Sequence, residues 1–149
     1  MRPIRRLDHV AVAVSSTEDA LCYFRDTLGL AVVRSEELVD PHVRLTYLDA
    51  GNAYVQLVEP LDSTLELAQW IAENGEGLHH LCFGVDDVPA AAAGLAAAGA
   101  PDVSLASGRG RVSAFVPGPT SHGVRVECTE FRVDEDVETV AGWLPPAGS

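Results

Sequence analysis

Basic side chains are scarce in this sequence of 149 residues. Lysine and arginine together number 10, against 22 aspartates and glutamates, and the formal net charge is −12. Proteins that bind nucleic acid or an anionic membrane surface need clustered positive charge, so this composition argues against both partners. The amino-terminal residues also lack an apolar stretch long enough for a signal peptide or a membrane span. We therefore expect a cytoplasmic protein.

Cysteine is rare as well, and its spacing is uninformative. Cys22, Cys82 and Cys128 form an odd set without a CxxC pair, and each lies in an apolar run. We expect reduced, buried thiols, as is usual inside the cell. With 47% hydrophobic and 21% charged residues, the chain has the composition and the length of one globular domain.

What the sequence does contain is an internal repeat. Residues 7–14 read LDHVAVAV and residues 78–85 read LHHLCFGV, so that His9 and His80 each begin a short apolar segment. The same offset of 71 residues aligns 51–57 with 122–128 without a gap, and it pairs Gln56 with Glu127. A register that holds over such distant segments indicates a duplicated unit of about 70 residues.

Each unit is predicted to fold as βαβββ. Hydrophobic patterning and the glycines that follow the helices predict these elements. The predicted strands cover 7–14, 30–36, 43–49 and 53–59, then 78–85, 102–106, 111–116 and 123–129, and the predicted helices cover 17–28 and 88–98. One domain is expected over 1–149, with a first module at 5–60, a helical linker at 61–77, a second module at 78–131 and an acidic tail at 132–149.

Strand alternation then predicts which side chains share a face. Val10, Val12 and Val14 should face the following helix, whereas His9 and the small residues after it should face the opposite way. The second unit repeats this arrangement, with Leu81, Phe83 and Val85 on the helix side and His80, Cys82 and Gly84 on the other. By the same alternation His79 should point to the helix side, and His42 and His122 fall in predicted turns, where we expect them to be solvated.

If the two units close into a cup, four side chains can converge in it. These are two imidazoles and two side chains with a free oxygen, His9, Gln56, His80 and Glu127. Such a set suits one divalent ion, Co²⁺, Zn²⁺, Mn²⁺ or Ni²⁺. Because the set contains no thiolate, we expect an open, exchangeable site and not a closed structural one.

Several segments together resemble the vicinal oxygen chelate (glyoxalase/bleomycin resistance/dioxygenase) superfamily, and within it the methylmalonyl-CoA epimerases. The segments are residues 7–14, Tyr23-Phe24 with Leu28-Gly29-Leu30, VQLVEP at 55–60 with Asp62-Ser63-Thr64, NGEGLHHLCFGVDDV at 74–88, and GVRVE at 123–127. The resemblance implies an α+β fold of two tandem βαβββ modules whose mixed sheets form a cupped metal site. It also implies that His9, Gln56, His80 and Glu127 are the metal ligands, and that the protein is a homodimer.

The resemblance further implies a metal-dependent isomerase that acts on an acyl thioester. A base removes the proton between the thioester and a carboxylate, the metal stabilises the enolate, and a proton returns on the opposite face. Glu127 would be both ligand and proton carrier. The alternatives are another metal enzyme of the superfamily, such as a lactoylglutathione-lyase-like isomerase or a polyketide or natural-product tailoring enzyme, and a non-catalytic small-molecule binding or resistance protein.

Three departures from the epimerase pattern bear on this hypothesis. Leu45 stands where many bacterial epimerases carry a second glutamate, and Tyr47 is the nearest polar side chain of the same parity, so we expect it to be the second catalytic group. Pro117-Gly118-Pro119 replaces the usual His-Pro-Lys, and Arg109, Arg111 and Arg125 are the candidates to replace that lysine. Residues 132–149 extend beyond the family's usual end, either as a short acidic helix or as a disordered tail.

Overall fold

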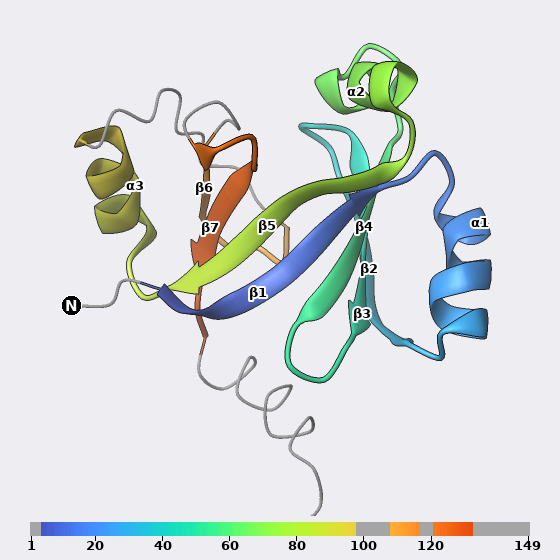
Figure 1. Cartoon of the computed structure of the whole chain (residues 1–149), viewed down its shortest axis with the longest axis horizontal. Coiled ribbons are helices and arrows are strands. Elements are labelled where there is room, and N and C mark those ends of the chain that lie inside the picture. The colour runs from blue at the N-terminus through green and yellow to red at the C-terminus, as the bar shows by residue number, and fades with distance from the viewer. Residues whose placement is uncertain (1–3, 98–107, 117–120, 133–149) are drawn as a thin grey trace, which may run out of the picture.

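The computed structural model describes residues 4–97, 108–116 and 121–132, and within them the chain forms a seven-stranded sheet with helices on its outer sides (Figure 1). The strands lie in the order β2-β3-β4-β1-β5-β7-β6. The elements are β1 Ile4–Ala13, α1 Thr17–Leu21, η1 Cys22–Thr27, β2 Ala31–Leu38, β3 Val43–Asp49, β4 Tyr54–Pro60, α2 Glu66–Asn74, β5 Gly77–Val85, α3 Val88–Ala97, β6 Ser113–Val116 and β7 Val126–Glu130.

The pairing of the strands repeats in the two halves of the chain. β1 pairs in parallel with β4, β5 pairs in parallel with β7, and β1 and β5 join the halves as antiparallel neighbours. This mixed sheet confirms the predicted α+β fold. The expected strand at 102–106 lies outside the described residues.

The predicted helix-facing sides of the strands are confirmed for Val12, Val14 and Val85. In the first half, Val14, Leu48 and Leu57 form a buried cluster against Leu21 and Phe24. In the second half, the cluster is built from Val85, Val88, Ala114 and Cys128, with Ala91 and Leu95 of α3. Figure 1 shows α1 and α3 at opposite sides of the molecule, with the strands between them.

The first helix differs in detail from the prediction. It starts as expected, because the Ser16 hydroxyl accepts a hydrogen bond from the Asp19 amide at 3.2 Å, as an N-cap does. From Cys22 to Thr27, however, it is a π-helix, in which the Thr27 hydroxyl donates to the Cys22 carbonyl five residues earlier.

The cysteine prediction is only partly right. Cys82 and Cys128 are buried free thiols, but Cys22 is exposed, because it lies on the outer side of this helix. None of the helices in the described ranges has the length and hydropathy of a membrane span.

Candidate metal centre

Three of the four predicted ligands meet at the middle of the sheet. His9 on β1, His80 on β5 and Glu127 on β7 are all buried, and each comes from a strand that neighbours the next. The Glu127 Oε2 atom lies 3.1 Å from His80 Nε2 and 3.3 Å from His9 Nε2. The ligand atoms of the three residues therefore lie close enough together to bind one ion.

Gln56, the fourth predicted ligand, lies beside them on β4. It is buried, it stands opposite Ala11 of β1, and it lines the same cavity as His80 and Glu127. Its amide nitrogen donates to the Tyr47 hydroxyl at 2.9 Å. The amide oxygen is thus the atom that Gln56 can offer to a cation.

The charges of the three-residue cluster are strongly coupled. Burial opposes ionisation of Glu127, but the hydrogen bond from His80 and the charge of the nearby His9 outweigh burial and hold its pKa well below the usual range. For His9, burial is outweighed by contacts with Asp8 and Glu127, and its pKa is raised. For His80, burial prevails over Glu127 and its pKa is lowered. Glu127 is consequently a carboxylate at neutral pH.

The chemistry of these donors fits a divalent metal. His9 Nε2 is a buried nitrogen without a hydrogen-bond partner, which is costly unless the nitrogen binds something else. Two imidazoles, one carboxylate and one amide oxygen form a mixed set typical of exchangeable divalent sites. Cys82 also lies near His9, but burial raises its pKa well above the usual value, so it remains a thiol.

His9 and His80 each follow a residue that forms a β-bulge, because it has no partner in the neighbouring strand. Between Leu7 and His9 strand β1 gains Asp8 relative to β5, and between Leu78 and His80 strand β5 gains His79 relative to β1. Such a bulge re-aims the side chain of the extra residue. The Nδ1 atom of His9 lies 2.6 Å from Asp8 Oδ2, and the Nδ1 atom of His80 lies 2.8 Å from His79 Nδ1.

The bulge overturns the expectation that His79 faces the helix side. Its ring instead packs against Trp70 of α2, with centroids 5.0 Å apart, and it lines the cavity beside His80. Strand alternation alone could not predict this, because one inserted residue reverses the parity. The repeat did carry a signal, since it aligns Asp8 with His79 before each ligand histidine.

Asp8 is a site residue that the sequence reasoning missed. It is fully buried, and its Oδ2 atom accepts a hydrogen bond from Arg109 at 2.6 Å. Arg111 lies 3.9 Å from the other carboxylate oxygen. Burial raises the pKa of Asp8, but contacts with His9 and Arg109 outweigh burial and the net shift is downward. Asp8 thus connects His9 to a loop that lies 101 residues away in the sequence.

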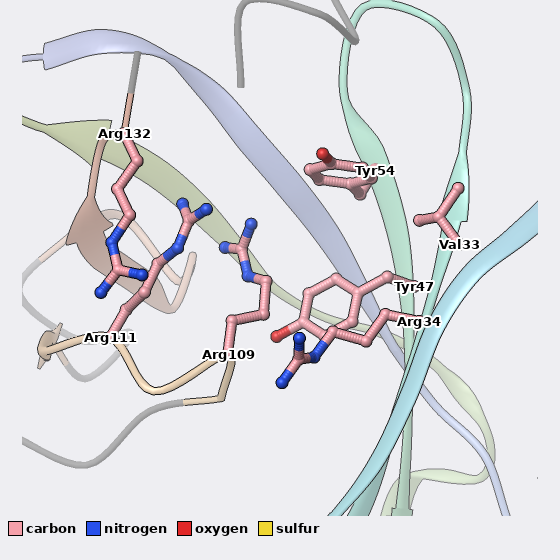
Figure 2. Close-up of a pocket in the computed structure, with 7 residues that line it drawn as sticks. All are labelled: Val33, Arg34, Tyr47, Tyr54, Arg109, Arg111 and Arg132. Carbon is pink, nitrogen blue, oxygen red and sulfur yellow. The ribbon is translucent and has the colours of Figure 1, made fainter. Parts of the chain in front are cut away.

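The two arginines that contact Asp8 belong to a small pocket of about 310 Å³. Its walls contain four arginines, two tyrosines and one valine, namely Arg34, Arg109, Arg111, Arg132, Tyr47, Tyr54 and Val33. Figure 2 shows Arg109, Arg111 and Arg132 on one side and Arg34 with the tyrosines on the other. The Arg109 guanidinium lies 4.8 Å from the centre of the Tyr47 ring, a cation–π contact that fixes both.

The predicted second catalytic group, Tyr47, lies between this pocket and the metal centre. It is buried, its ring is 5.9 Å from the His9 ring, and burial raises the pKa of its phenol strongly. Leu45 is also buried and packs with Val43 and Val58. The position that carries a glutamate in many epimerases is therefore apolar here.

Gly108 is packed tightly against this part of the site. A Cβ atom at this position would lie 2.5 Å from Leu45 Cδ1 and 2.7 Å from the Tyr47 hydroxyl. We expect Gly108→Ala to lower the free energy of unfolding by about 1–3 kcal/mol, as overpacking does. Gly94→Ala in α3 is the control, because a Cβ there meets open space and alanine favours a helix. Urea unfolding compares them, and equal stability of both variants would contradict the packing.

His80, Glu127 and Gln56 also line a larger cavity of about 700 Å³. Most of the wall is apolar and comes from both halves of the chain and α2, including Leu38, Val43, Leu45, Val58, Leu65, Leu67, Trp70 and Phe115. Arg125 supplies a guanidinium to this wall, 2.9 Å from His79 Nε2. Burial, with His80 and Arg125 nearby, lowers the pKa of His79 to about 3.

The remaining sequence predictions concern two histidines, three arginines and two segments of the chain. His42 and His122 lie in turns and are exposed, as expected. Arg109 and Arg111 lie at the small pocket and Arg125 at the large one, so the three arginines do not form one cluster. The loop at 117–119 and the tail from 133 onward lie outside the described residues.

Comparisons with known proteins agree with this geometry. The model of the Glyoxalase/Bleomycin resistance protein/Dioxygenase superfamily matches residues 8–115. The ethylmalonyl-CoA/methylmalonyl-CoA epimerase of Cereibacter sphaeroides is 36% identical over 98 residues, which are 65% of this chain and 73% of that protein. The mitochondrial methylmalonyl-CoA epimerase of Mus musculus is 37% identical over 87 residues, 58% of this chain and 49% of that protein.

A solved structure gives the same relationship over more of the chain. The structure of a methylmalonyl-CoA epimerase in complex with methylmalonyl-CoA and NH4+ has a TM-score of 0.77 and 31% identity, and the match covers 85% of this chain and 94% of that one. In sequence, by contrast, the chain spans about half the length of several curated relatives that it matches.

Proposed function

Because the chain belongs to the glyoxalase/bleomycin resistance/dioxygenase superfamily, we propose that it is a metal-dependent epimerase of a methylmalonyl-CoA-like, 2-substituted malonyl thioester. The observation that carries the proposal is the buried cluster of His9, His80 and Glu127, two members of which, His80 and Glu127, line a 700 Å³ cavity. A buried carboxylate beside two imidazoles suits proton abstraction better than simple binding, since a binding cavity does not need such a costly group.

The proposed ligands of the ion are His9, Gln56, His80 and Glu127. The support is the buried His9 Nε2 atom, which makes no hydrogen bond, the short contacts of Glu127 with both histidines, and the orientation of Gln56, whose amide nitrogen donates to Tyr47. When a divalent cation is bound there, it supplies Lewis-acid stabilisation of negative charge on the substrate's oxygens.

Glu127 is the proposed proton acceptor. Its lowered pKa keeps it ionised at neutral pH, so it is always in the form that can accept a proton. The carboxylate is a weak base, and removal of the C2 proton therefore depends on charge stabilisation at the thioester oxygen. The product of this step is an enolate, which loses the configuration at C2.

Tyr47 is the proposed donor of the returning proton. The phenol stays protonated because burial raises its pKa strongly, and its oxygen already accepts a hydrogen bond from Gln56. Its own proton is therefore free to be given to the face of the enolate opposite Glu127. Leu45 cannot take this part, because its side chain has no proton to transfer.

We expect Tyr47→Phe to slow epimerisation by about 100-fold, the usual contribution of one general acid. Binding of zinc should stay near the wild-type level, because Gln56 is retained. The measurement is epimerisation of methylmalonyl-CoA by the zinc-loaded variant. Tyr23→Phe, which removes an exposed hydroxyl from η1, is the control. An unchanged rate in Tyr47→Phe would remove the phenol from the reaction.

The apolar wall of the cavity can accept alkyl substituents of different length at C2. Val43, Leu45 and Val58 form this wall, and Leu45 adds apolar surface where a carboxylate would repel an alkyl group. Both ethylmalonyl-CoA and methylmalonyl-CoA are therefore candidates. Similar rates of epimerisation for the two thioesters would support a pocket that does not discriminate by the length of the alkyl group.

The proposed function is tested with a single epimer of methylmalonyl-CoA. Zinc-loaded or cobalt-loaded protein should convert it to the equilibrium mixture, measured by chromatography that resolves the two diastereomers of methylmalonyl-CoA. The hemithioacetal of methylglyoxal and glutathione is assayed in parallel. Turnover of this compound alone would instead assign the chain to the lactoylglutathione-lyase type of reaction.

A further inference from the structure

The two proposed ligand histidines, His9 and His80, are contacted at Nδ1 by different kinds of side chain. The bulge residue Asp8 contacts Nδ1 of His9 and is itself bound by Arg109. In the second half, His79 contacts Nδ1 of His80 and is bound by Arg125. Each of the two histidines is thus connected to an arginine, His9 through the carboxylate of Asp8 and His80 through the imidazole of His79.

The direction of the hydrogen bonds in the second half follows from the chemistry of arginine. A guanidinium can only donate, so His79 Nε2, 2.9 Å from Arg125, must accept. His79 is then neutral and carries its one proton on Nδ1, which donates to His80 Nδ1 at 2.8 Å. His80 in turn carries its proton on Nε2 and donates it to Glu127 at 3.1 Å.

The first half has the opposite arrangement. A carboxylate can only accept, so His9 must donate its Nδ1 proton to Asp8 at 2.6 Å. In the neutral form of His9 this leaves a lone pair on Nε2, the buried atom without a hydrogen-bond partner. A histidine nitrogen that carries a proton cannot bind a metal ion, and one with a lone pair can. The contact with Asp8 therefore keeps Nε2 of His9 free of a proton and able to bind a metal ion. The contacts of Arg125 and His79 instead keep a proton on Nε2 of His80, which prevents metal binding by that atom.

We propose that Arg125 is a positioning residue that holds His80 in the tautomer unable to bind a metal through Nε2, and that metal binding reverses this hydrogen-bond chain and releases Arg125 from His79. The proposal rests on the metal centre of the proposed function. Once His80 binds through Nε2, its proton is on Nδ1 and is donated to His79. His79 then carries its proton on Nε2, where it meets the N–H of Arg125 and can no longer accept.

The released guanidinium has a defined place to go. Arg125 is half-buried, lines the 700 Å³ cavity, and lies 5.9 Å from the centre of the Trp70 ring, so it can stay over the indole while it leaves His79. Its donors then face the cavity, where an anionic group of the acyl substrate can accept them. Metal loading would in this way prepare the cavity for an anion.

Histidine tautomers can be observed directly in the full chain. With ¹⁵N-labelled histidine, long-range proton–nitrogen spectra of the metal-free protein should show His79 protonated on Nδ1 and His80 on Nε2. Addition of Zn²⁺ should move both protons, to Nε2 of His79 and to Nδ1 of His80. A metal-free protein with His80 already protonated on Nδ1 would overturn the proposal.

Zinc affinity gives a second test that needs no turnover. Arg125→Met removes the donor that fixes the direction of these hydrogen bonds. Zinc should therefore bind about tenfold more tightly, the lower end of the effects found when a partner of a ligand histidine is changed. His79→Asp, which copies Asp8 into the second half, should also tighten binding. Arg5→Met, which loses an exposed ion pair with Asp86, is the control and should bind zinc as the wild type does.

The outcomes separate this proposal from the proposed function. If wild-type protein binds zinc and Arg125→Met binds it equally or more weakly, the role of Arg125 is wrong and the metal centre stands. If the wild type does not bind zinc at all, the metal centre itself is wrong, and both proposals fall.

Discussion

Replacement of Glu127 by glutamine is expected to abolish exchange of the C2 hydrogen of methylmalonyl-CoA, with a loss of at least about 100-fold. Glutamine has nearly the same shape, but it cannot accept the proton and is a weaker ligand. Deuterium incorporation from D₂O, measured by mass spectrometry on the zinc-loaded protein, is the assay. The far-ultraviolet circular dichroism spectrum should be unchanged.

The control for this variant comes from the same strand. Glu130→Gln, also on β7, alters a half-exposed carboxylate that pairs with Arg132, and it should exchange hydrogen at the wild-type rate. If Glu127→Gln continued to exchange at the wild-type rate, Glu127 would not be the proton acceptor.

Asp8→Asn is expected to weaken zinc binding by about 10-fold to 100-fold, the range found when the partner of a ligand histidine is lost. An amide accepts a weaker hydrogen bond from His9 Nδ1, and it can also present its donor side. Because Arg109 and Arg111 lose their buried carboxylate, the free energy of unfolding should also fall by about 3–5 kcal/mol.

Titration calorimetry with zinc and urea unfolding measure the two effects separately. Asp86→Asn is the matched control, because Asp86 forms an exposed ion pair with Arg5 and should change stability by no more than about 0.5 kcal/mol. A folded Asp8→Asn protein with wild-type zinc affinity would show that Asp8 only supports the fold.

Much of this fold could be predicted because the sequence contains an internal repeat, so that one half can be aligned with the other. The offset that pairs His9 with His80 also pairs Gln56 with Glu127, and strand alternation then places all four side chains on one face. The helix-facing valines and the cavity-facing histidines agree with that alternation, since each strand needs one apolar face against a helix.

The features that the sequence did not predict are those that interrupt the regular alternation of side chains along a strand. A bulge adds one residue to a strand, and no pattern in residues 7–14 or 78–85 distinguishes such an insertion from regular alternation. For this reason the contact of Asp8 with His9 and the cavity position of His79 were not foreseen.

Contacts between distant segments were also beyond sequence reasoning. Arg109 reaches Asp8 across 101 residues, and its guanidinium packs on Tyr47. The close approach of Gly108 to Leu45 belongs to the same group. These contacts connect the loop at 108–111 to the first half of the chain, and only the assembled sheet brings the segments together.

The most direct test of the account is the exchange of hydrogen at C2 of methylmalonyl-CoA in D₂O. The zinc-loaded wild-type protein should introduce deuterium at C2 well above the buffer rate, and prior removal of the metal with a chelator should stop the exchange. Failure of the zinc-loaded protein to incorporate deuterium above the buffer rate would contradict the proposed epimerase.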